Sequence, residues 1–147
     1  MPSRILINSK LNILATADEV WRVISDWTLI PQFWHGTRSL SRNDDGSFRI
    51  RFAFPAKGVL KIEKMPTKRL VKETYTRGPF SGTKDVSVTE GKDFCTISST
   101  WDIKLKFPYT IFYKKMKDHM RSIVYYLNIM WLAYLIYSFK VVALYKG

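Results

Sequence analysis

The stretch that most constrains the fold is Ser122–Phe139, which reads SIVYYLNIMWLAYLIYSF and carries no charged side chain. It lies within a longer segment, from Tyr109 to Tyr145, that contains neither Gly nor Pro. This pattern predicts one long C-terminal helix, apolar over most of its circumference. Such a helix crosses a bilayer, fills a core or lines an apolar cavity. The residues that precede it indicate which of these three kinds of protein the chain forms.

The composition predicts a single domain that spans residues 1–147. Aromatic residues make up 15% of the chain and no low-complexity tract interrupts it, which argues against disorder. Cys95 is the only cysteine, which excludes an intramolecular disulfide and is typical of a reducing compartment. The N-terminal residues lack the apolar core of a secretory signal, so we expect a cytoplasmic protein.

The net charge of +12 favours anionic partners such as nucleic acids, anionic membranes or acidic small molecules. The basic residues are spread along the chain, however, and no helix-turn-helix or zinc-finger spacing directs them at a groove. We therefore expect a solvated basic surface and no specific nucleic acid partner. Transient contact with an anionic membrane stays open.

Alternating apolar and polar residues predict strands with one apolar face. The first such strand covers residues 5–14. Between residues 37 and 105, turn-forming Gly, Pro, Asn and Asp recur at short intervals, which predicts an antiparallel meander of six strands. The apolar side chains that share a face in this meander include Phe48, Ile50, Phe52, Trp101 and Ile103.

Two short helices are expected between the first strand and the meander. Thr16 and Glu19 have the spacing of a capping box ahead of a helix that ends near Asp26. A second helical stretch runs from Thr28 to Trp34 and closes at Gly36. The expected order is one strand, two short helices, six strands and one long helix.

A sheet with one apolar face and a single long helix to cover it is expected to curve around that helix. The predicted class is α+β: a helix-grip fold with a curved antiparallel sheet of about seven strands, two short helices and one long C-terminal helix. Because a curved sheet and a straight helix match imperfectly, we expect a cavity between them. A fully packed core is the alternative.

The stretch Ala15–Gly36, ATADEVWRVISDWTLIPQFWHG, resembles the opening of the START-like (helix-grip, Bet v 1-like) superfamily. The shared pattern is a small residue, an acidic pair, Val-Trp, Ser-Asp, and then Pro and Trp before Gly. The turn at Met65–Leu70 and the long final helix also fit, so the resemblance covers almost the whole chain. It implies a fold more than a function, because members include lipid transfer domains, plant hydrophobic-ligand proteins, polyketide cyclases and ubiquinone-binding proteins. The chain is most similar to a small thermoacidophile family of fatty-acid carriers, in its small size, its basic character and its aromatic final helix.

One stripe of the expected helix should face the sheet, and its three methionines form a soft wall suited to an alkyl chain. The stripe consists of Phe112, Met116, Met120, Ile123, Leu127, Met130, Tyr134 and Val141. From both walls together, the predicted hydrophobic contacts of a ligand are Phe48, Ile50, Phe52, Tyr75, Trp101, Met116, Met120 and Leu127. Gap-filling in an ordinary core is the alternative interpretation of the methionines.

Glu73 is the unexpected residue of the strand from Leu70 to Arg77, because alternation places it on the apolar face with Tyr75. Such a carboxylate is either paired with a Lys or Arg, or is a polar anchor or general acid whose pKa burial raises. The candidates for contact with a ligand head group are Arg38, Glu73, Arg77, Tyr113 and His119.

The sequence predicts no metal and no cofactor. His35 and His119 are the only histidines, and neither has metal-ligand spacing to the other or to Cys95. Cys95 lies in a predicted strand and no Gly-rich oxyanion loop is present, which argues against a covalent hydrolase.

The far side of the expected long helix becomes apolar near its end, at Leu132, Leu135, Ile136 and Phe139. A surface of this kind is rarely left exposed, so we expect a homodimer contact or docking on a membrane or another protein. Packing beneath the first short helix is the alternative. A membrane anchor is less favoured, because five of the 18 uncharged residues are Tyr or Trp.

Together these patterns favour an intracellular, non-enzymatic carrier of a hydrophobic ligand, with a long-chain fatty acid held between the sheet and the C-terminal helix. One alternative is an enzyme of the polyketide cyclase or dehydratase kind, in which Glu73, Tyr75 and His119 do acid–base chemistry. The other is a basic module that binds RNA or an anionic membrane.

Overall fold

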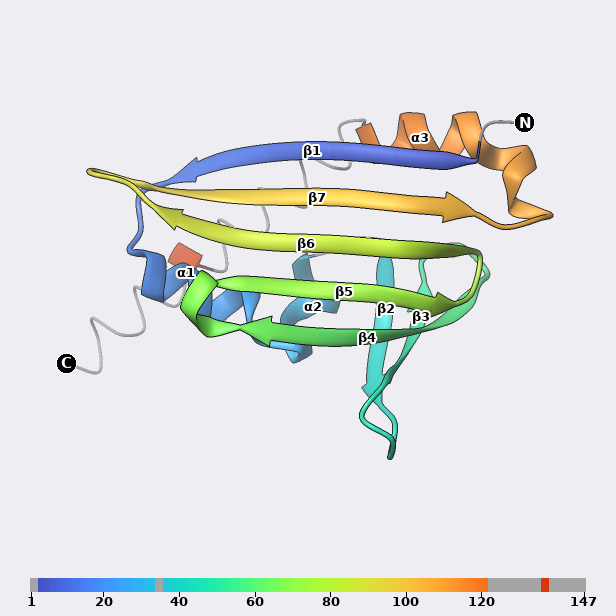
Figure 1. Cartoon of the computed structure of the whole chain (residues 1–147), viewed down its shortest axis with the longest axis horizontal. Helices are drawn as coiled ribbons and strands as arrows, with labels where there is room; N and C mark the ends of the chain where they lie inside the picture. The colour runs from blue at the N-terminus through green and yellow to red at the C-terminus, as the bar shows by residue number, and fades with distance from the viewer. Residues whose placement is uncertain (1–2, 34–35, 122–135, 138–147) are drawn as a thin grey trace.

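The fold is a seven-stranded antiparallel sheet in the order β1-β7-β6-β5-β4-β3-β2. A computed structural model describes residues 3–33, 36–121 and 136–137. The strands are β1 (Arg4–Ile13), β2 (Thr37–Arg42), β3 (Phe48–Phe52), β4 (Lys57–Met65), β5 (Leu70–Arg77), β6 (Phe80–Glu90) and β7 (Cys95–Leu105). Strands β2 to β7 form the predicted meander, and β1 pairs with β7 (Figure 1). The predicted α+β helix-grip class with a curved sheet is confirmed.

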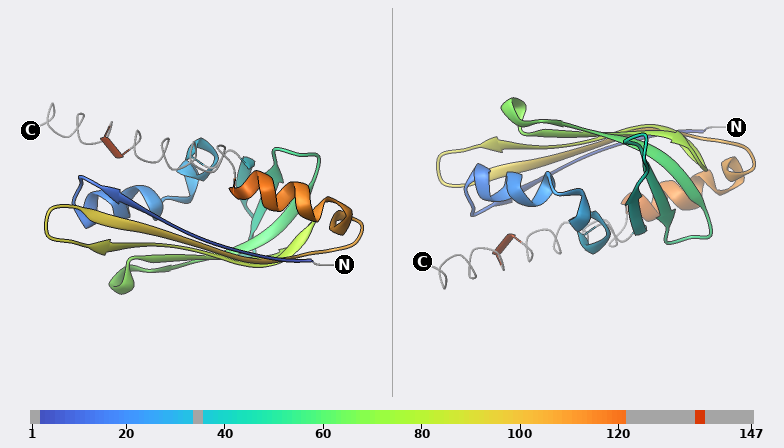
Figure 2. Two further views of the ribbon diagram at one scale, coloured as in Figure 1. Left: turned by 90° about the horizontal axis from the view of Figure 1, so that it is seen from above. Right: turned by 90° about the horizontal axis from the view of Figure 1, so that it is seen from below.

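The helices all lie on one side of this sheet (Figure 2). They are α1 (Ala17–Ile24), the 3-10 turn η1 (Trp27–Leu29), α2 (Ile30–Phe33), the 3-10 turn η3 (Tyr109–Phe112) and α3 (Tyr113–Arg121), while the 3-10 turn η2 (Pro66–Lys68) joins β4 to β5. We call the face that these helices cover the inner face. It is concave, because β2 and β3 bend away from the other strands (Figure 2).

The start of α1 follows the local sequence signals. Thr16 Oγ1 accepts a hydrogen bond from Glu19 N at 3.2 Å, and Glu19 Oε2 accepts one from Thr16 N at 2.9 Å. This is the predicted capping box. The helix ends at Ile24, two residues before the predicted end, and Asp26 instead caps η1 by accepting a hydrogen bond from Thr28 N.

Two apolar clusters fill the inner face. The first lies under α1 and consists of Ile13, Ala17, Val20, Val23, Ile24, Ile30, Val86, Val88, Cys95, Ile97 and Ile136. The second lies toward the other end of the sheet and consists of Ile5, Ile7, Phe48, Ile50, Phe52, Leu60, Tyr75, Phe80, Ile103 and Leu105. The alternation of buried and exposed side chains along β1 and β3 is the one expected from the sequence.

The C-terminal segment begins with a 3-10 turn, and this changes which side chains face the sheet. Tyr113 and Met116 pack against the second cluster, whereas Phe112 is 47% exposed. The prediction that Phe112 faces the sheet is wrong, because η3 has three residues per turn and so alters the phase of the helix that follows.

The predicted continuation of the helix beyond Arg121 lies outside the described residues, except for residues 136–137. Ile136 is buried in the first cluster with residues of α1. The structure therefore supports packing of Ile136 beneath the first helix. Because its side chain is buried in this cluster, Ile136 cannot form the predicted homodimer contact. Leu132, Leu135 and Phe139 fall outside the described ranges. Within those ranges, the structure contains no helix long and apolar enough to span a bilayer.

Gly82 allows the backbones of β6 and β7 to approach closely, because it has no side chain. Its φ is +133°, and an added Cβ would overlap the carbonyl oxygen of Asp102 and lie 2.8 Å from Ile103 Cα. Residues with a side chain rarely adopt this conformation. A side chain here would therefore push two central strands apart.

We predict that Gly82→Ala lowers the free energy of unfolding by about 3 kcal/mol, because backbone strain and steric overlap act together. The measurement is urea denaturation followed by far-ultraviolet circular dichroism. Gly36→Ala is the matched control, since no atom lies within 4 Å of an added Cβ there. Equal stability of the two variants would contradict the close contact at Gly82.

Candidate functional site

A row of paired residues crosses the middle of the inner face. Glu73 of β5 pairs with Lys84 of β6, Lys84 pairs with Trp101 of β7, and Trp101 pairs with Ile7 of β1. Because side chains directly opposite each other on one face of a sheet lie close together, the register brings an acidic, a basic and an aromatic side chain into contact.

Glu73 and Lys84 form a buried ion pair. Lys84 Nζ lies 3.2 Å from Glu73 Oε2, and the two side chains are 2% and 4% exposed, Lys84 being the more buried. On β6, Lys84 stands between Phe80 of the second cluster and Val86 of the first, so the pair interrupts an otherwise apolar face.

Aromatic side chains surround the pair on one side. Lys84 Nζ lies 4.8 Å from the centre of the Trp101 ring, within the range of a cation–π contact. The Tyr75 ring is stacked with Trp101 at 6.0 Å between centroids and meets Phe80 edge-on at 4.9 Å. Phe52 lies 5.3 Å from Phe80. The site therefore combines a charge pair with a wall of flat apolar surface.

Burial changes the titration of two groups in this site. Removal from water lowers the pKa of Lys84 to about 8, although the charge of Glu73 acts in the opposite direction. Burial, together with the charge of Glu73, raises the pKa of Tyr75 well above 10. Lys84 can thus gain or lose a proton near neutral pH, while the Tyr75 hydroxyl keeps its proton and can donate a hydrogen bond.

Most of the predicted sheet residues lie on the inner face. Phe48, Ile50, Phe52, Glu73 and Tyr75 are all buried there. Partly buried Trp101, Tyr113 and Met116 pack against the second cluster. Their predicted roles in binding a ligand stay predictions.

Other predicted residues are not brought to this site. Arg38 and Arg77 have exposed side chains, so neither joins the inner-face group as a head-group contact. The side chains of His119 and Met120 lie outside what the structure describes, and so does Leu127. The helix wall of the predicted cavity falls largely in the same segment, outside the described residues.

Lys84 is the residue that the sequence interpretation missed. It is the one buried basic residue of the described ranges. The signal was present, because Phe80, Val86 and Val88 have the same parity in the strand and predict their shared face. A lysine on the apolar side of a strand is normally predicted to be exposed. Only recognition of Glu73 on the neighbouring strand as its partner would have predicted its burial.

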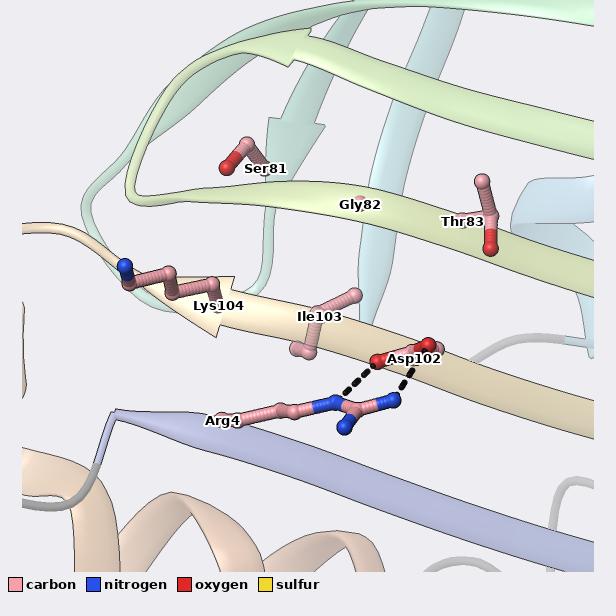
Figure 3. Close-up of a pocket in the computed structure, with 7 residues that line it drawn as sticks. All are labelled: Arg4, Ser81, Gly82, Thr83, Asp102, Ile103 and Lys104. Carbon is pink, nitrogen blue, oxygen red and sulfur yellow. Dashed lines mark hydrogen bonds and ion pairs between the residues drawn. The ribbon is translucent and has the colours of Figure 1, made fainter.

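The opposite, convex face carries a shallow depression of about 390 Å³ (Figure 3). It is lined by Arg4, Ser81, Gly82, Thr83, Asp102, Ile103 and Lys104. Arg4 and Asp102 form a two-pronged ion pair there, with N–O distances of 2.8 and 2.9 Å. Arg4 is largely exposed, Asp102 is partly exposed, and the two satisfy each other, which is the arrangement of an ordinary surface ion pair.

Comparison with known proteins identifies the fold. No family model and no curated protein matches the sequence. A START superfamily protein from Mycobacterium smegmatis is similar in structure, with a TM-score of 0.69 and 14% identity over 91% of this chain and 98% of that one. The aromatase/cyclase Zhui from Streptomyces sp. R1128 has a TM-score of 0.69 and 11% identity, over 90% of this chain and 91% of that one. A norcoclaurine synthase point mutant from Thalictrum flavum, in complex with a transition state analogue, has a TM-score of 0.68 and 20% identity, over 95% of this chain and 99% of that one.

These similarities confirm the START-like, helix-grip fold that the sequence predicted, and they correct one expectation. The chain was expected to be non-enzymatic. Two of the structures with the same fold are named as enzymes, an aromatase/cyclase and a norcoclaurine synthase. The fold is therefore compatible with catalysis, and the expectation of a non-enzymatic protein is withdrawn.

We predict that the free energy of unfolding rises between about pH 8 and pH 10 through the titration of Lys84. In this window the unfolded state retains a proton that the folded state has lost, so increasing pH favours the folded state. Above about pH 10, Tyr75 acts in the opposite direction, because its hydroxyl ionises first in the unfolded chain.

The measurement is urea denaturation at several pH values from neutral to about 9.5, for the wild type and for the double variant Glu73→Leu/Lys84→Met. The wild type should gain stability relative to the double variant as the pH rises. Lys61→Met, at an exposed position of β4, is the control and should follow the wild type. Parallel curves for wild type and double variant would contradict the assigned titration of Lys84.

Proposed function

We propose that this chain binds an amphiphilic small molecule on the inner face of its sheet, and that the ligand is a long-chain fatty acid. The observation that carries the proposal is the buried Glu73–Lys84 pair between two apolar clusters. The proposal has two parts, a surface for the hydrocarbon chain and a buried charge for the carboxylate.

The burial of the ion pair itself supports a functional role. Removal of two charges from water costs several kcal/mol per ion, and apolar residues of similar volume are often as stable or more stable in such a position. The two side chains are 2% and 4% exposed, so leucine and methionine at these positions would stabilise the fold about as well as the ion pair does. Perturbed ionisable groups in such surroundings are typical of binding and catalytic sites.

The second cluster offers the surface for a hydrocarbon chain. Phe52, Tyr75 and Phe80 form a continuous group of aromatic contacts, and Met116 of α3 packs against the same cluster. Each methylene removed from water contributes about 0.8 kcal/mol. Met116 adapts its shape more readily than a branched residue, which suits a flexible alkyl chain.

The proposed partner of the fatty-acid carboxylate is Lys84. A charge-assisted hydrogen bond from an ammonium group to a carboxylate is strong in surroundings from which water is excluded. Glu73 would then face a second carboxylate. The carboxylate of the ligand and that of Glu73 would then share the ammonium group of Lys84.

The expected binding behaviour is an affinity that rises about fourfold for each added methylene, from the transfer free energy of a buried CH₂. Isothermal titration calorimetry with saturated fatty acids of increasing length measures this trend. Matched primary alcohols test the carboxylate, and Lys84→Gln should remove the preference for acid over alcohol. Lys61→Gln on the exposed side of β4 is the control and should retain it. Affinity that is independent of chain length, or an acid preference that survives Lys84→Gln, would overturn the proposal.

A second candidate function is acid–base catalysis on a bound carbonyl compound. The pKa of Lys84 near 8 favours it, because a general base is most effective when its pKa is close to the working pH. Glu73 pairs with Lys84 and supplies a carboxylate, and Tyr75, which stacks on the Trp101 ring that Lys84 contacts, supplies a hydrogen-bond donor. Lys84 thus joins Glu73 and Tyr75, which the sequence had suggested for an enzyme of the cyclase or dehydratase kind.

Exchange of hydrogen for deuterium next to the carbonyl of a long-chain methyl ketone tests this candidate. Nuclear magnetic resonance in D₂O measures the exchange rate as a function of pH. The catalysed rate should rise through about pH 8 as Lys84 loses its proton, and Lys84→Gln should abolish it. Tyr75→Phe should lower the rate while leaving the midpoint near pH 8 unchanged. Exchange no faster than in buffer would exclude this chemistry for ketones.

A further inference from the structure

The connection between β7 and α3 exposes large apolar side chains at one end of the molecule. We call residues 106–112 the β7–α3 link. Phe107 is 85% exposed, the highest value for a large hydrophobic side chain among the described residues, and Ile111 and Phe112 are 62% and 47% exposed. Single exposed apolar residues are ordinary, but three within six positions are not.

The packing around the link holds these side chains outward. The amide of Lys106 donates to the carbonyl oxygen of Pro79 at 2.9 Å, and the amide of Leu105 donates to that of Ser3 at 2.8 Å. The inward positions of this segment are occupied by Tyr113 and Met116, which pack against the second cluster. The exposed side chains of the link therefore have no place to fold back into that part of the core.

The charges around the link are mostly positive, and the exposed Asp118 of α3 is the next acidic residue along the chain. Residues 103–117 contain five lysines and no acidic residue. Of these, Lys104, Lys106, Lys114 and Lys115 have exposed side chains. The β5–β6 turn, which follows Arg77 at the end of β5, lies at the same end of the sheet (Figure 1). Gly78 of that turn approaches the carbonyl oxygen of Lys57, so two more basic residues adjoin this end.

We propose that the β7–α3 link docks the protein on an anionic membrane surface. Phe107, Ile111 and Phe112 would enter the boundary between head groups and acyl chains, while the surrounding lysines contact anionic head groups. Stable attachment to a membrane needs two signals, and the link combines an apolar one with a basic one. The predominantly positive charge around the apolar side chains fits anionic lipid better than an ordinary protein surface of evenly mixed charge. This proposal does not depend on the ligand proposed for the inner face.

The test is co-sedimentation of the full chain with phosphatidylcholine vesicles that contain or lack phosphatidylserine. Binding is expected only to the anionic vesicles and should weaken as salt is added. Phe107→Ser/Ile111→Ser should lower the partition coefficient by about tenfold or more, because the inserted apolar area is lost. Lys106→Gln/Lys114→Gln should lower it by about fivefold for each charge removed.

The controls are Phe94→Ser and Lys92→Gln in the β6–β7 hairpin at the opposite end of the sheet, where both side chains are exposed. They match the chemistry of the link variants and should leave binding unchanged. All substituted side chains are exposed, and circular dichroism checks that each variant is folded.

Three results would overturn the proposal. The first is failure of the wild type to bind phosphatidylserine vesicles, and the second is an equal loss of binding in the hairpin controls. The third is a change of oligomeric mass in Phe107→Ser/Ile111→Ser, measured by light scattering, without a change in vesicle binding. That result would assign the link to contact with a second copy of the chain.

Discussion

Burial of one face of the sheet is the interaction on which the rest of this structure depends. The antiparallel sheet presents Ile5, Ile50, Leu60 and Ile103, from four of its strands, to the same side, and each is fully or almost fully buried. A face of this size must be covered, so α1, α2 and α3 lie on that side and β2 and β3 curve toward it (Figure 2). The opposite face carries exposed ion pairs such as Arg4–Asp102 and needs no cover.

The Glu73–Lys84 pair is the exception within this apolar face, and the proposed functions follow from it. The two residues are Cα partners in the β5–β6 ladder, so the pair is built into the backbone register and does not rely on flexible side chains reaching across a gap. A rigid pair beside Tyr75 and Trp101 can hold a carboxylate or exchange a proton, and both uses require the surrounding apolar residues to exclude water. Fold similarity alone does not choose between them.

The buried ion pair and the exposed apolar side chains lie in different parts of the molecule. The ion pair lies in the middle of the inner face, whereas the exposed apolar side chains of the β7–α3 link lie at one end, next to basic residues. Tyr113 and Met116 connect the two regions, because they belong to the segment that carries the link and pack against the second cluster. A protein that exchanges an amphiphile with a membrane needs a surface of each kind.

The local sequence was sufficient to predict the strands, the capped first helix and the inward positions of Glu73 and Tyr75, because alternation and capping depend on residues close together in the chain. It did not identify Lys84 as the partner of Glu73, since that contact depends on the register between two strands. Nor did it predict the exposure of Phe112, because a 3-10 turn replaced the expected start of the helix. Tertiary structure decided these points, because cross-strand register and the docking of a helix on a sheet are set by the burial of whole faces.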